Sequence, residues 1–484
     1  MNKKAKTAIQ PTRSEDFPGW YQKVITAADL AENSKTRGCM IIKPYGYAIW
    51  ENIQSAFDLK IKAHGVENAY FPLLIPLKFI ASEAEHIDGF AKECAVVTHH
   101  KLEMDAEGKG LIPAGKLEEP YVIRPTSETV IGDAMSRWIN SYRDLPMKLN
   151  QWCNVMRWEM RTRLFLRTSE FLWQEGHNAF ATAEESDTDA RLMADVYAKF
   201  AENVLAIPVI TGEKTASERF PGAKSTYTIE AVMQDGKALQ AGTSHNLGTN
   251  FAKSSGIVFQ DKSGKEQFAH TTSWGISTRL IGGLIMVHSD DDGLQLPPAI
   301  APYQVVIIPV IKDLDQADAI NEYVEGIKNR LTAKSIRVQV NRKDDSMGNK
   351  IWDSIKKGVP IRVEIGVKEV ESKTLTHVRR DIGRDSRAST SIDEFIDTAP
   401  AILDSIQNSL FERAKAIVSD NLADADNIDS LENMYTNDYQ GLVRIPAELI
   451  DEEQYKKVAR QFSLSERCLP FADNNNMVVI GRAY

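Results

Sequence analysis

The hydrophobic positions in the first part of the chain follow two periods, one typical of helices and one typical of strands. Apolar residues recur every three or four positions over 44–65, which predicts a helix, and a second helix with an acidic start is expected over 184–206. The run AYFPLLIP (69–76) predicts a short buried strand interrupted by prolines. Alternation around an Asp-Gly turn over 225–248 predicts a β-hairpin, so we expect an antiparallel sheet here.

The pattern changes near residue 304. The segment 290–304 combines charge, glycine and three prolines, which is typical of a linker. Beyond it, buried strands and amphipathic helices alternate over 305–366 in the order strand, helix, strand, helix, strand. This order predicts a compact parallel-sheet domain. The remainder is helix-rich and ends in the apolar run MVVIGRAY, which predicts a small tail domain.

The composition is that of an ordinary globular protein. Of the 484 residues, 43% are hydrophobic and 26% charged, and there is no apolar run of about 18 residues that could cross a membrane. The N-terminus is basic without an apolar core behind it, so no secretory signal is expected. Cys39, Cys94, Cys153 and Cys468 lie far apart, which argues against a disulfide framework or a cysteine zinc knuckle. We therefore expect a cytoplasmic protein.

Charge gives little support for a nucleic-acid partner. The formal net charge of −9 speaks mildly against one, although the segment TLTHVRRDIGRDSRAS (374–389) is locally basic. Such a patch can hold a phosphate backbone even on an acidic protein, because distant charges are screened beyond about 8 Å. A solvated loop explains the same charges equally well.

The common motifs that bind phosphates or activate nucleophiles are missing. The sequence has no GxxxxGK[ST] loop, no GxGxxG after a strand, no HExxH and no GxSxG. What remains is a set of short motifs rich in arginine, carboxylates and small polar residues. In RPTSE (124–128), Thr126 and Glu128 could bind an ammonium together. A helix start capped by Thr126 or Ser127 is the commoner explanation of such a segment.

The segment RWEMRTRLFLRTSEFLWQEGH (157–177) gathers arginines, carboxylates and aromatic rings. It predicts two strands joined by the turn MRTRLFLRT. In a strand, Arg157 and Glu159 would point to the same side, where they could meet a phosphate and an amino group. Phe171 could then cover an aromatic ring of the ligand. A surface hairpin with cross-strand salt bridges is the alternative, and the density of rings favours a site.

Two further motifs place polar residues around glycines. LQAGTSHNLG (239–248) brings Gln240, Thr243 and His245 close together. HTTSWGISTRLIGGLIMVH (270–288) leads from a glycine-bearing strand to Arg279 and a buried helix. A guanidinium at the start of a buried helix needs a partner, because an unpaired buried charge is costly. A phosphate is the natural partner, and a distant Asp or Glu is the alternative.

In this order the motifs resemble those of class II aminoacyl-tRNA synthetases. RWE…SEF is similar to their motif 2, GISTRLIGG to motif 3 and YFPLLIP to the weaker motif 1. RPTSE, FLWQEGHNAF, GTSHNLG and SWGISTR narrow the resemblance to prolyl-tRNA synthetases in the form found in archaea and eukaryotes. The resemblance implies an α+β catalytic domain built on an antiparallel sheet (1–296), an α/β anticodon-binding domain (301–400) and a small α+β C-terminal domain (401–484).

The resemblance also implies a reaction and a role for each motif residue. The family attaches L-proline to tRNA in two steps through prolyl-adenylate, releasing pyrophosphate and then AMP. Arg157 and Arg279 would be the catalytic residues. ATP would be held by Arg157, Glu159, Phe171, Gln240, Thr243, Ser277 and Arg279. Proline would be held by Thr126, Glu128, Arg157, Trp173, Glu175, His177, Phe220 and His245.

Several expectations about partners follow from the same resemblance. Mg²⁺ would arrive with ATP and be held by Glu159 and Gln240. No structural zinc is expected, because the tail carries only Cys468 where relatives often have a cysteine cluster. Motif 1 implies a homodimer, the anticodon domain implies tRNA, and the final Tyr484 implies a terminus directed toward the catalytic domain. The stretch between motifs 2 and 3 is too short for the editing domain inserted in bacterial-type relatives.

Two alternatives remain open. A threonyl-type synthetase would need a Cys and His zinc set, which the sequence lacks, since the adjacent pair His99 and His100 cannot chelate as a unit. A non-catalytic relative would bind tRNA or a sensor ligand on the same fold, but such proteins usually lose a motif arginine. Arg157 and Arg279 are both present, which favours an enzyme.

Overall fold

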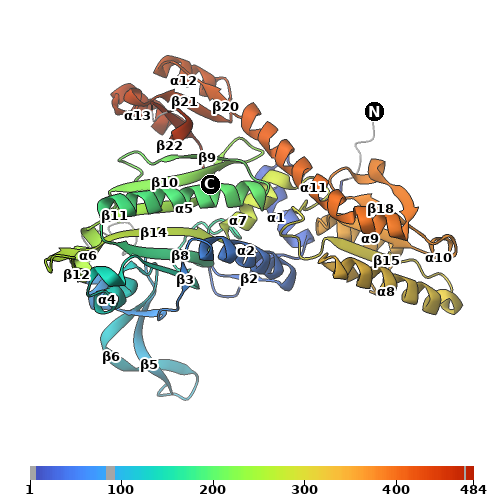
Figure 1. Cartoon of the computed structure of the whole chain (residues 1–484), viewed down its shortest axis with the longest axis horizontal. Coiled ribbons are helices and arrows are strands. Elements are labelled where there is room, and N and C mark those ends of the chain that lie inside the picture. The colour runs from blue at the N-terminus through green and yellow to red at the C-terminus, as the bar shows by residue number, and fades with distance from the viewer. Residues whose placement is uncertain (1–6, 83–92, 474–475) are drawn as a thin grey trace.

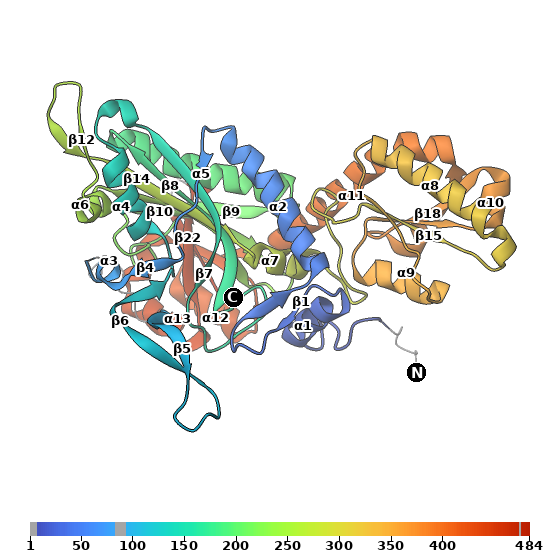
Figure 2. The ribbon, with the colours of Figure 1, turned by 90° about the horizontal axis from the view of Figure 1, so that it is seen from below.

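The structure, a computed structural model, describes residues 7–82, 93–473 and 476–484. Its elements form a main body, an α/β part at one end and a C-terminal part that lies against the main body (Figures 1 and 2). No helix in these described ranges is both long and apolar enough to span a membrane.

One 11-stranded sheet runs through the main body and the C-terminal part, in the order β20-β21-β23-β22-β9-β10-β11-β14-β8-β7-β3. All of its neighbouring strands are antiparallel except β3 with β7 and β20 with β21. The main body supplies β3 (Glu67–Asn68), β7 (Met147–Met156), β8 (Glu170–Phe180), β9 (Val209–Glu213), β10 (Ser225–Val232), β11 (Ala238–Gly248) and β14 (His270–Ser277). The C-terminal part supplies β20 (Leu422–Asp424), β21 (Leu442–Pro446), β22 (Ser465–Pro470) and β23 (Met477–Gly481). The predicted antiparallel sheet and the 225–248 hairpin are confirmed.

Helices cover the main sheet because their apolar faces match its buried side. In α2 (Pro44–Lys62) the apolar residues at helical spacing are buried, and Pro44 occupies the first turn, where a missing N–H costs nothing. In α5 (Ala183–Asn203) a capping box joins Thr182 and Glu185, as expected at the start of an amphipathic helix. Both helix predictions are confirmed. The other helices of the main body are α1 (Phe17–Ala27), α3 (Leu77–Ser82), α4 (Glu128–Trp138), α6 (Asn250–Ser255) and α7 (Arg279–His288).

The strand predicted over 69–76 is only partly correct. The structure has a strand only at β4 (Leu74–Pro76). The preceding residues use their backbone groups elsewhere: the Phe71 N–H donates to the Gln151 side chain at 2.6 Å, and the Phe71 carbonyl accepts from Arg124 at 2.8 Å. Pro72 has no N–H to donate to a ladder. A sequence pattern does not reveal such competition from distant side chains.

The smaller sheets of the main body lie at its edges. β4 joins a long hairpin of β5 (Val96–Met104) and β6 (Leu111–Ile123), which projects from the main body in Figure 1. The remaining pairs are β1 (Ala31–Asn33) with β2 (Met40–Ile42) and β12 (Val258–Gln260) with β13 (Glu266–Phe268).

The α/β part follows the predicted alternation of strands and helices. Its elements are β15 (Val305–Pro309), α8 (Ala317–Ala333), β16 (Val338–Val340), α9 (Met347–Lys356), β17 (Ile361–Ile365), α10 (Val367–Ser372), β18 (Thr374–Arg379) and β19 (Ala388–Ser391). β16, β15 and β17 are parallel, as predicted, and β18 and β19 extend the sheet in antiparallel fashion.

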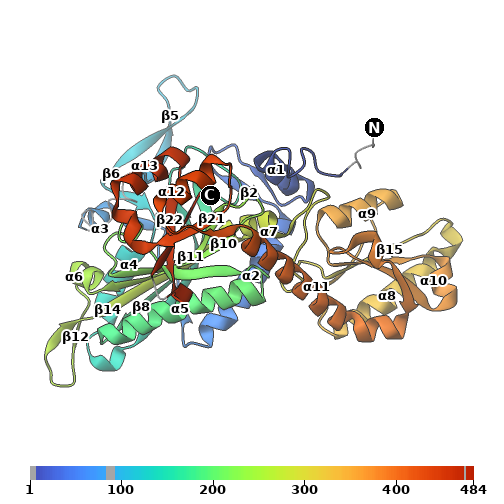
Figure 3. The ribbon, with the colours of Figure 1, turned by 90° about the horizontal axis from the view of Figure 1, so that it is seen from above.

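The long helix α11 (Ile392–Asp420) leads from the α/β part to the C-terminal part, so residue 400 lies inside one continuous helix. The C-terminal part also contains α12 (Ile428–Thr436) and α13 (Glu453–Phe462), and Figure 3 shows both against the main body, far from α8 to α10. Tyr484 donates its hydroxyl to Asp235 at 2.6 Å, and its ring lies 5.6 Å from the Arg163 guanidinium. The chain end is therefore directed toward the main body, as expected.

Candidate active site

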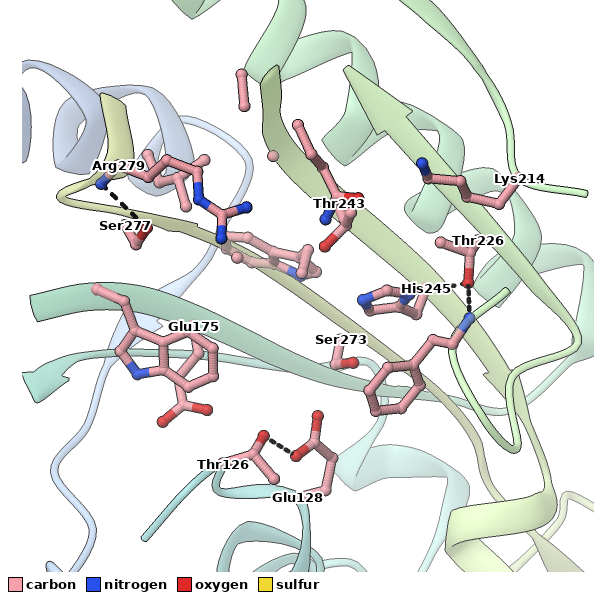
Figure 4. A pocket seen from close by; sticks show the side chains of 18 of the residues that line it. Thr126, Glu128, Glu175, Lys214, Thr226, Thr243, His245, Ser273, Ser277 and Arg279 are labelled. Carbon is pink, nitrogen blue, oxygen red and sulfur yellow. Dashed lines mark hydrogen bonds between the residues drawn. The ribbon is translucent and has the colours of Figure 1, made fainter. Parts of the chain in front are cut away.

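A cavity of about 320 Å³ lies over strands β8, β14, β11 and β10 (Figure 4). Its lining includes every predicted site residue except Glu159. The register explains this convergence, because side chains at alternate positions share one face of a sheet. On β8 and β14, Glu175 is opposite Gly275 and His177 is opposite Ser273. Four motifs that are far apart in the sequence thus meet on one face of the sheet.

One end of the cavity is acidic. Glu128 begins helix α4, and its carboxylate accepts a hydrogen bond from Thr126 Oγ1. Figure 4 shows this pair at the cavity wall, with a carboxylate oxygen directed inward. The segment does start a helix, as the commoner explanation of RPTSE predicts, and ammonium binding by Thr126 and Glu128 stays a prediction. Ser127 occupies the N-cap position without a side-chain cap bond, and its hydroxyl donates to Glu175 instead.

Glu175 is the centre of a buried hydrogen-bond network. It accepts from Ser127, from Gln151 Nε2 at 2.9 Å and from the Cys153 thiol at 3.4 Å, and it pairs with His177 Nε2 at 3.0 Å. Burial alone would raise the pKa of Glu175, but the hydrogen bond and charge of His177 and the bonds from Ser127 and Gln151 lower it below its usual value. Burial by itself would lower the pKa of His177. The hydrogen bond and the charge of Glu175 outweigh burial, so the pKa of His177 is raised above its usual value. Both shifts favour the charged forms, so Glu175 and His177 form an ion pair more readily than the isolated groups would.

This ion pair predicts a pH dependence of stability. Because the pKa of His177 is higher in the folded protein than the value of about 6.5 in an unfolded chain, its protonation stabilises the fold fully below pH of about 6.5. That contribution is lost as the pH rises through the folded pKa. We expect the thermal midpoint of the wild type to fall with pH above this value, and the His177→Gln variant to lack this fall.

His245 and His288 do not change their charge in this pH range. Burial lowers the pKa of His245 to about 3 and of His288 to about 4, so both are neutral throughout it. His100→Gln, on the exposed face of β5, is the matched control and should keep the wild-type profile. An identical slope in His177→Gln would contradict the ion-pair account.

An aromatic wall closes one side of the cavity. The Phe220 ring lies 4.6 Å from the His245 ring, and His245 Nδ1 is 3.0 Å from Thr226 Oγ1. The Phe220 N–H donates to the same hydroxyl at 3.1 Å, which fixes the loop to β10. Trp173 donates its indole N–H to the Cys153 thiol at 3.2 Å. These rings line the same cavity as the carboxylates of Glu128 and Glu175.

Arg157 stands between the two ends of the site. It follows β7 rather than lying within it, so the predicted strand geometry for Arg157 and Glu159 is wrong. Its Nε donates to the Pro125 carbonyl at 2.8 Å, and its guanidinium lies 5.7 Å from the Phe171 ring and 5.3 Å from the Trp173 ring. Burial lowers the pKa of Arg157 to about 10, so the side chain remains charged at neutral pH.

A second cavity of about 360 Å³ continues beyond Arg157. It shares Arg157, Phe171, Ser277 and Arg279 with the main cavity and adds Glu159 and Arg167. Phe171 and Trp173 meet edge to face at 6.1 Å, so the Phe171 ring forms part of the wall between the cavities. The Glu159 carboxylate accepts from the Arg161 N–H at 2.8 Å. Three arginines and two glutamates, Glu93 and Glu159, line this cavity, so its net positive charge suits it to an anion.

Arg279 is the first residue of α7, as the sequence predicts. Its backbone N–H donates to Ser277 Oγ at 3.2 Å, and among the residues that the structure describes no carboxylate forms a salt bridge with its guanidinium. Burial lowers the pKa of Arg279, and the nearby charge of Arg167 lowers it further. A buried guanidinium in this setting is expected to gain from an anionic ligand.

The sequence did not identify Arg167 as a site residue. It lies in the hairpin turn, where Arg163 and Arg167 exchange backbone hydrogen bonds of 2.7 and 2.8 Å around Phe165, which has φ of 62°. The turn packs closely on α7, because a Cβ at Gly282 would lie 2.5 Å from Leu166 Cδ2. The cluster of arginines in this turn could have indicated from the sequence that Arg167 is a site residue. No comparable sequence pattern indicated the other residues that were missed, which are Lys214, Arg219 and Gln151.

Metal ligands are sparse in the described part of the chain. It contains no group of three or more His, Cys, Asp or Glu that could hold a metal ion. The two residues predicted to hold Mg²⁺ line different cavities, Gln240 the main one and Glu159 the second. Both present oxygen donors, the type that Mg²⁺ prefers when phosphates and waters complete its shell.

Comparisons with known proteins agree with this geometry. A family model described as the tRNA synthetase class II core domain (G, H, P, S and T) matches residues 114–288, and one described as an anticodon binding domain matches residues 304–401. The Proline--tRNA ligase of Bdellovibrio bacteriovorus is 52% identical over 474 residues, which cover 96% of this chain and 94% of that protein. The Proline--tRNA ligase of Akkermansia muciniphila is 52% identical over 477 residues, with coverage of 96% and 94%.

The solved structures give the same result. The prolyl-tRNA synthetase of Cryptosporidium parvum, crystallised with halofuginone and AMPPNP, superposes with a TM-score of 0.89. It is 36% identical in sequence, and the match covers 99% of each chain. The chain therefore belongs to the proline–tRNA ligase family of class II aminoacyl-tRNA synthetases.

Proposed function

We propose that this chain activates L-proline with ATP and attaches it to tRNA, with proline in the main cavity and the adenine end of ATP in the second. This proposal rests on the arrangement of charges in the site, where carboxylates lie on one side of Arg157 and further arginines lie on the other. A zwitterionic amino acid needs an acceptor for its ammonium and a cation near its carboxylate. Proline-dependent exchange of pyrophosphate into ATP tests it directly.

The chemistry needs positioning and charge stabilisation rather than a protein nucleophile. A proline carboxylate oxygen attacks the α-phosphorus in line, an O–P bond forms, and the bond to the β-phosphate oxygen breaks to release pyrophosphate. Arg157, held by the Pro125 carbonyl and flanked by two rings, would stabilise the charge on the α-phosphate. Arg279 would stabilise the γ-phosphate end. The 3′-hydroxyl of the terminal adenosine of tRNA then attacks the prolyl carbonyl, and AMP leaves.

The remaining site residues fall into two groups. Thr126 and Glu128 would take the two N–H groups of the proline ammonium, while Trp173, Phe220 and His245 would wall its ring. Glu175 and His177 are better explained as positioning residues, because the Glu175 oxygens are already bonded to protein groups.

Around the nucleotide, Phe171 would stack on adenine, and Glu159 would accept a hydrogen bond from its amino group. The phosphates and the ribose would be contacted by Gln240, Thr243 and Ser277. Bound Mg²⁺ would add positive charge on the phosphates, held in part by Glu159 and Gln240.

We assign tRNA recognition to the α/β part, over about 301–400, and regard the segments 1–296 and 401–484 as the catalytic and C-terminal domains. The basic segment 374–389 is a weak candidate for RNA binding, because Arg379, Arg380 and Arg387 form ion pairs with Asp381, Asp290 and Glu364. A better candidate for RNA binding is a cavity of about 420 Å³ beyond the ends of β15 and β16. Its lining includes Lys312, Asn321, Asn341, Arg342 and Lys350.

A double variant tests this assignment. Lys312→Met with Lys350→Met should raise the KM for tRNA, with the effect confined to the tRNA-dependent step. If both lysines contact phosphates of a single-stranded loop, the log–log salt slope of tRNA binding should become shallower by about 1.4, from about 0.7 per contact. Lys334→Met, on the exposed end of α8, is the matched control. An unchanged slope in the double variant would place tRNA elsewhere.

We also infer a homodimer located in the cytoplasm. Large apolar side chains near motif 1 are exposed in the single chain: Leu59 by 73%, Tyr70 by 74% and Leu74 by 40%. Large exposed apolar side chains support burial against a second copy. None of the four cysteines, all in the described part of the chain, is paired in a disulfide, which supports a reducing compartment.

A further inference from the structure

The C-terminal part is joined to the catalytic sheet beside the active site. β22 pairs with β9, with Leu469 opposite Glu213 and Pro470 opposite Gly212. The approach is close, since a Cβ at Gly212 would lie 2.3 Å from the Leu469 carbonyl oxygen. Arg467 thus enters the main body from β22, and Lys214 follows β9 directly.

Arg467, Glu230 and Lys214 form a buried charge triad. The Glu230 carboxylate accepts from Arg467 Nη2 at 2.8 Å and Nε at 3.1 Å on one oxygen, and from Lys214 Nζ at 3.0 Å on the other. Thr228 Oγ1 adds a bond of 2.9 Å. The side chains of Lys214, Glu230 and Arg467 are only 3%, 0% and 9% exposed. Two cations share one carboxylate, so the triad carries a net charge of +1.

The triad borders the phosphate side of the active site. Lys214 lines the main cavity, and Glu230 lies opposite Gln240 in the β10–β11 register. Figure 4 shows Lys214 above Thr226 and His245 and across the cavity from Arg279, and both cations lie away from Thr126 and Glu128. The pKa of Arg279, lowered mainly by burial, is also lowered by the charge of Arg467 and raised by that of Glu230, as expected for neighbouring charges.

A purely structural link between the two parts would need only one cation. A buried carboxylate is neutralised by a single bidentate arginine, and a second buried cation adds a desolvation cost. That cost is offset if an anion binds nearby in the working enzyme. The triphosphate of ATP is such an anion.

We propose that Arg467, Glu230 and Lys214 act together as a positioning group whose surplus positive charge helps to hold the β- and γ-phosphates of ATP and the departing pyrophosphate. The C-terminal part thereby completes the ATP site. This inference rests on the proposed function, because it assumes that the arginine end of the cavity receives the triphosphate.

Variants that change the net charge separate this role from a structural one. Arg467→Met makes the triad neutral and should raise the KM for ATP, and for pyrophosphate in the reverse reaction, by about tenfold. The KM for proline at saturating ATP should change by less than about twofold, since the triad lies away from the carboxylate end. The double variant Arg467→Met with Glu230→Gln returns the net charge to +1 and should recover most of the affinity for ATP. A structural link predicts no such recovery.

Arg444→Met is the matched control. Arg444 forms a bidentate pair with Asp424 at 2.7 and 2.9 Å in the same C-terminal part, but on its surface. The Arg444→Met variant should leave the KM for ATP, for pyrophosphate and for proline unchanged. An unchanged KM for ATP in Arg467→Met, or no recovery in the double variant, overturns the proposal.

A single variant covers the case in which Arg467→Met does not fold. Glu230→Gln raises the net charge to +2 and should lower the KM for ATP, so a higher KM overturns the proposal. Absence of proline-dependent exchange in the wild type would instead refute the proposed function itself. The two failures are therefore distinguishable.

Discussion

Replacing Arg279 by methionine should slow proline-dependent adenylate formation by about a thousandfold. Methionine retains the length and apolar stem of the side chain, so the start of α7 and its contact with Ser277 Oγ should persist. What is lost is a buried positive charge beside Arg167 that faces the second cavity. The charge on the departing pyrophosphate would then be stabilised by fewer fixed donors, which raises the barrier to its release.

Single-turnover measurements of prolyl-adenylate formation would give this rate. Arg137→Met is a suitable control, because Arg137 lies on the exposed side of α4 and pairs with its neighbour Asp133 across one helical turn. Thermal unfolding should show similar midpoints for both variants. A rate within about tenfold of the wild type for Arg279→Met would contradict the role assigned to this residue.

Glu128→Gln should raise the KM for proline by about a hundredfold and leave the KM for ATP nearly unchanged. The carboxylate of Glu128 begins α4 and is bonded to Thr126, so the substitution preserves size and hydrogen bonding but removes the charge. A secondary ammonium loses its charged acceptor, and hydrogen bonds between charged groups are about twice as strong as neutral ones.

Asp133→Asn provides the control on the same helix, since it removes one carboxylate from the exposed side of α4. It should leave the KM for proline unchanged. If Glu128→Gln altered the KM for ATP and proline equally, Glu128 would support the fold of the cavity rather than bind the ammonium.

The sequence predicted those elements whose local pattern matches their environment. The helix from Pro44, the capped helix after Thr182 and the 225–248 hairpin were correct, because spacing, caps and turn residues are local signals. The segment 69–76 was only partly correct, since the side chains of Gln151 and Arg124 take backbone groups that a strand would use. Arg157 was placed in a strand that ends one residue earlier.

The site shows the same division. Residues carried by motifs, such as Arg279 and His245, converge on one cavity as expected. The sequence did not identify the site residues whose positions depend on contacts between distant segments. Lys214 and Arg467 meet at Glu230 only because β22 joins the sheet beside β9, and the hydrophobic pattern of β22 does not reveal its neighbour. The role of Ser127 as a donor to Glu175 likewise follows from a tertiary contact.

We expect the cavity to select proline and to activate it with ATP. The most direct test is ATP–pyrophosphate exchange with purified protein, Mg²⁺ and a panel of amino acids, without tRNA. We predict strong exchange with proline and faint exchange with alanine and cysteine, because a missing methylene costs only about 1–3 kcal/mol. No exchange with any amino acid, or strong exchange with one other than proline, would contradict the account.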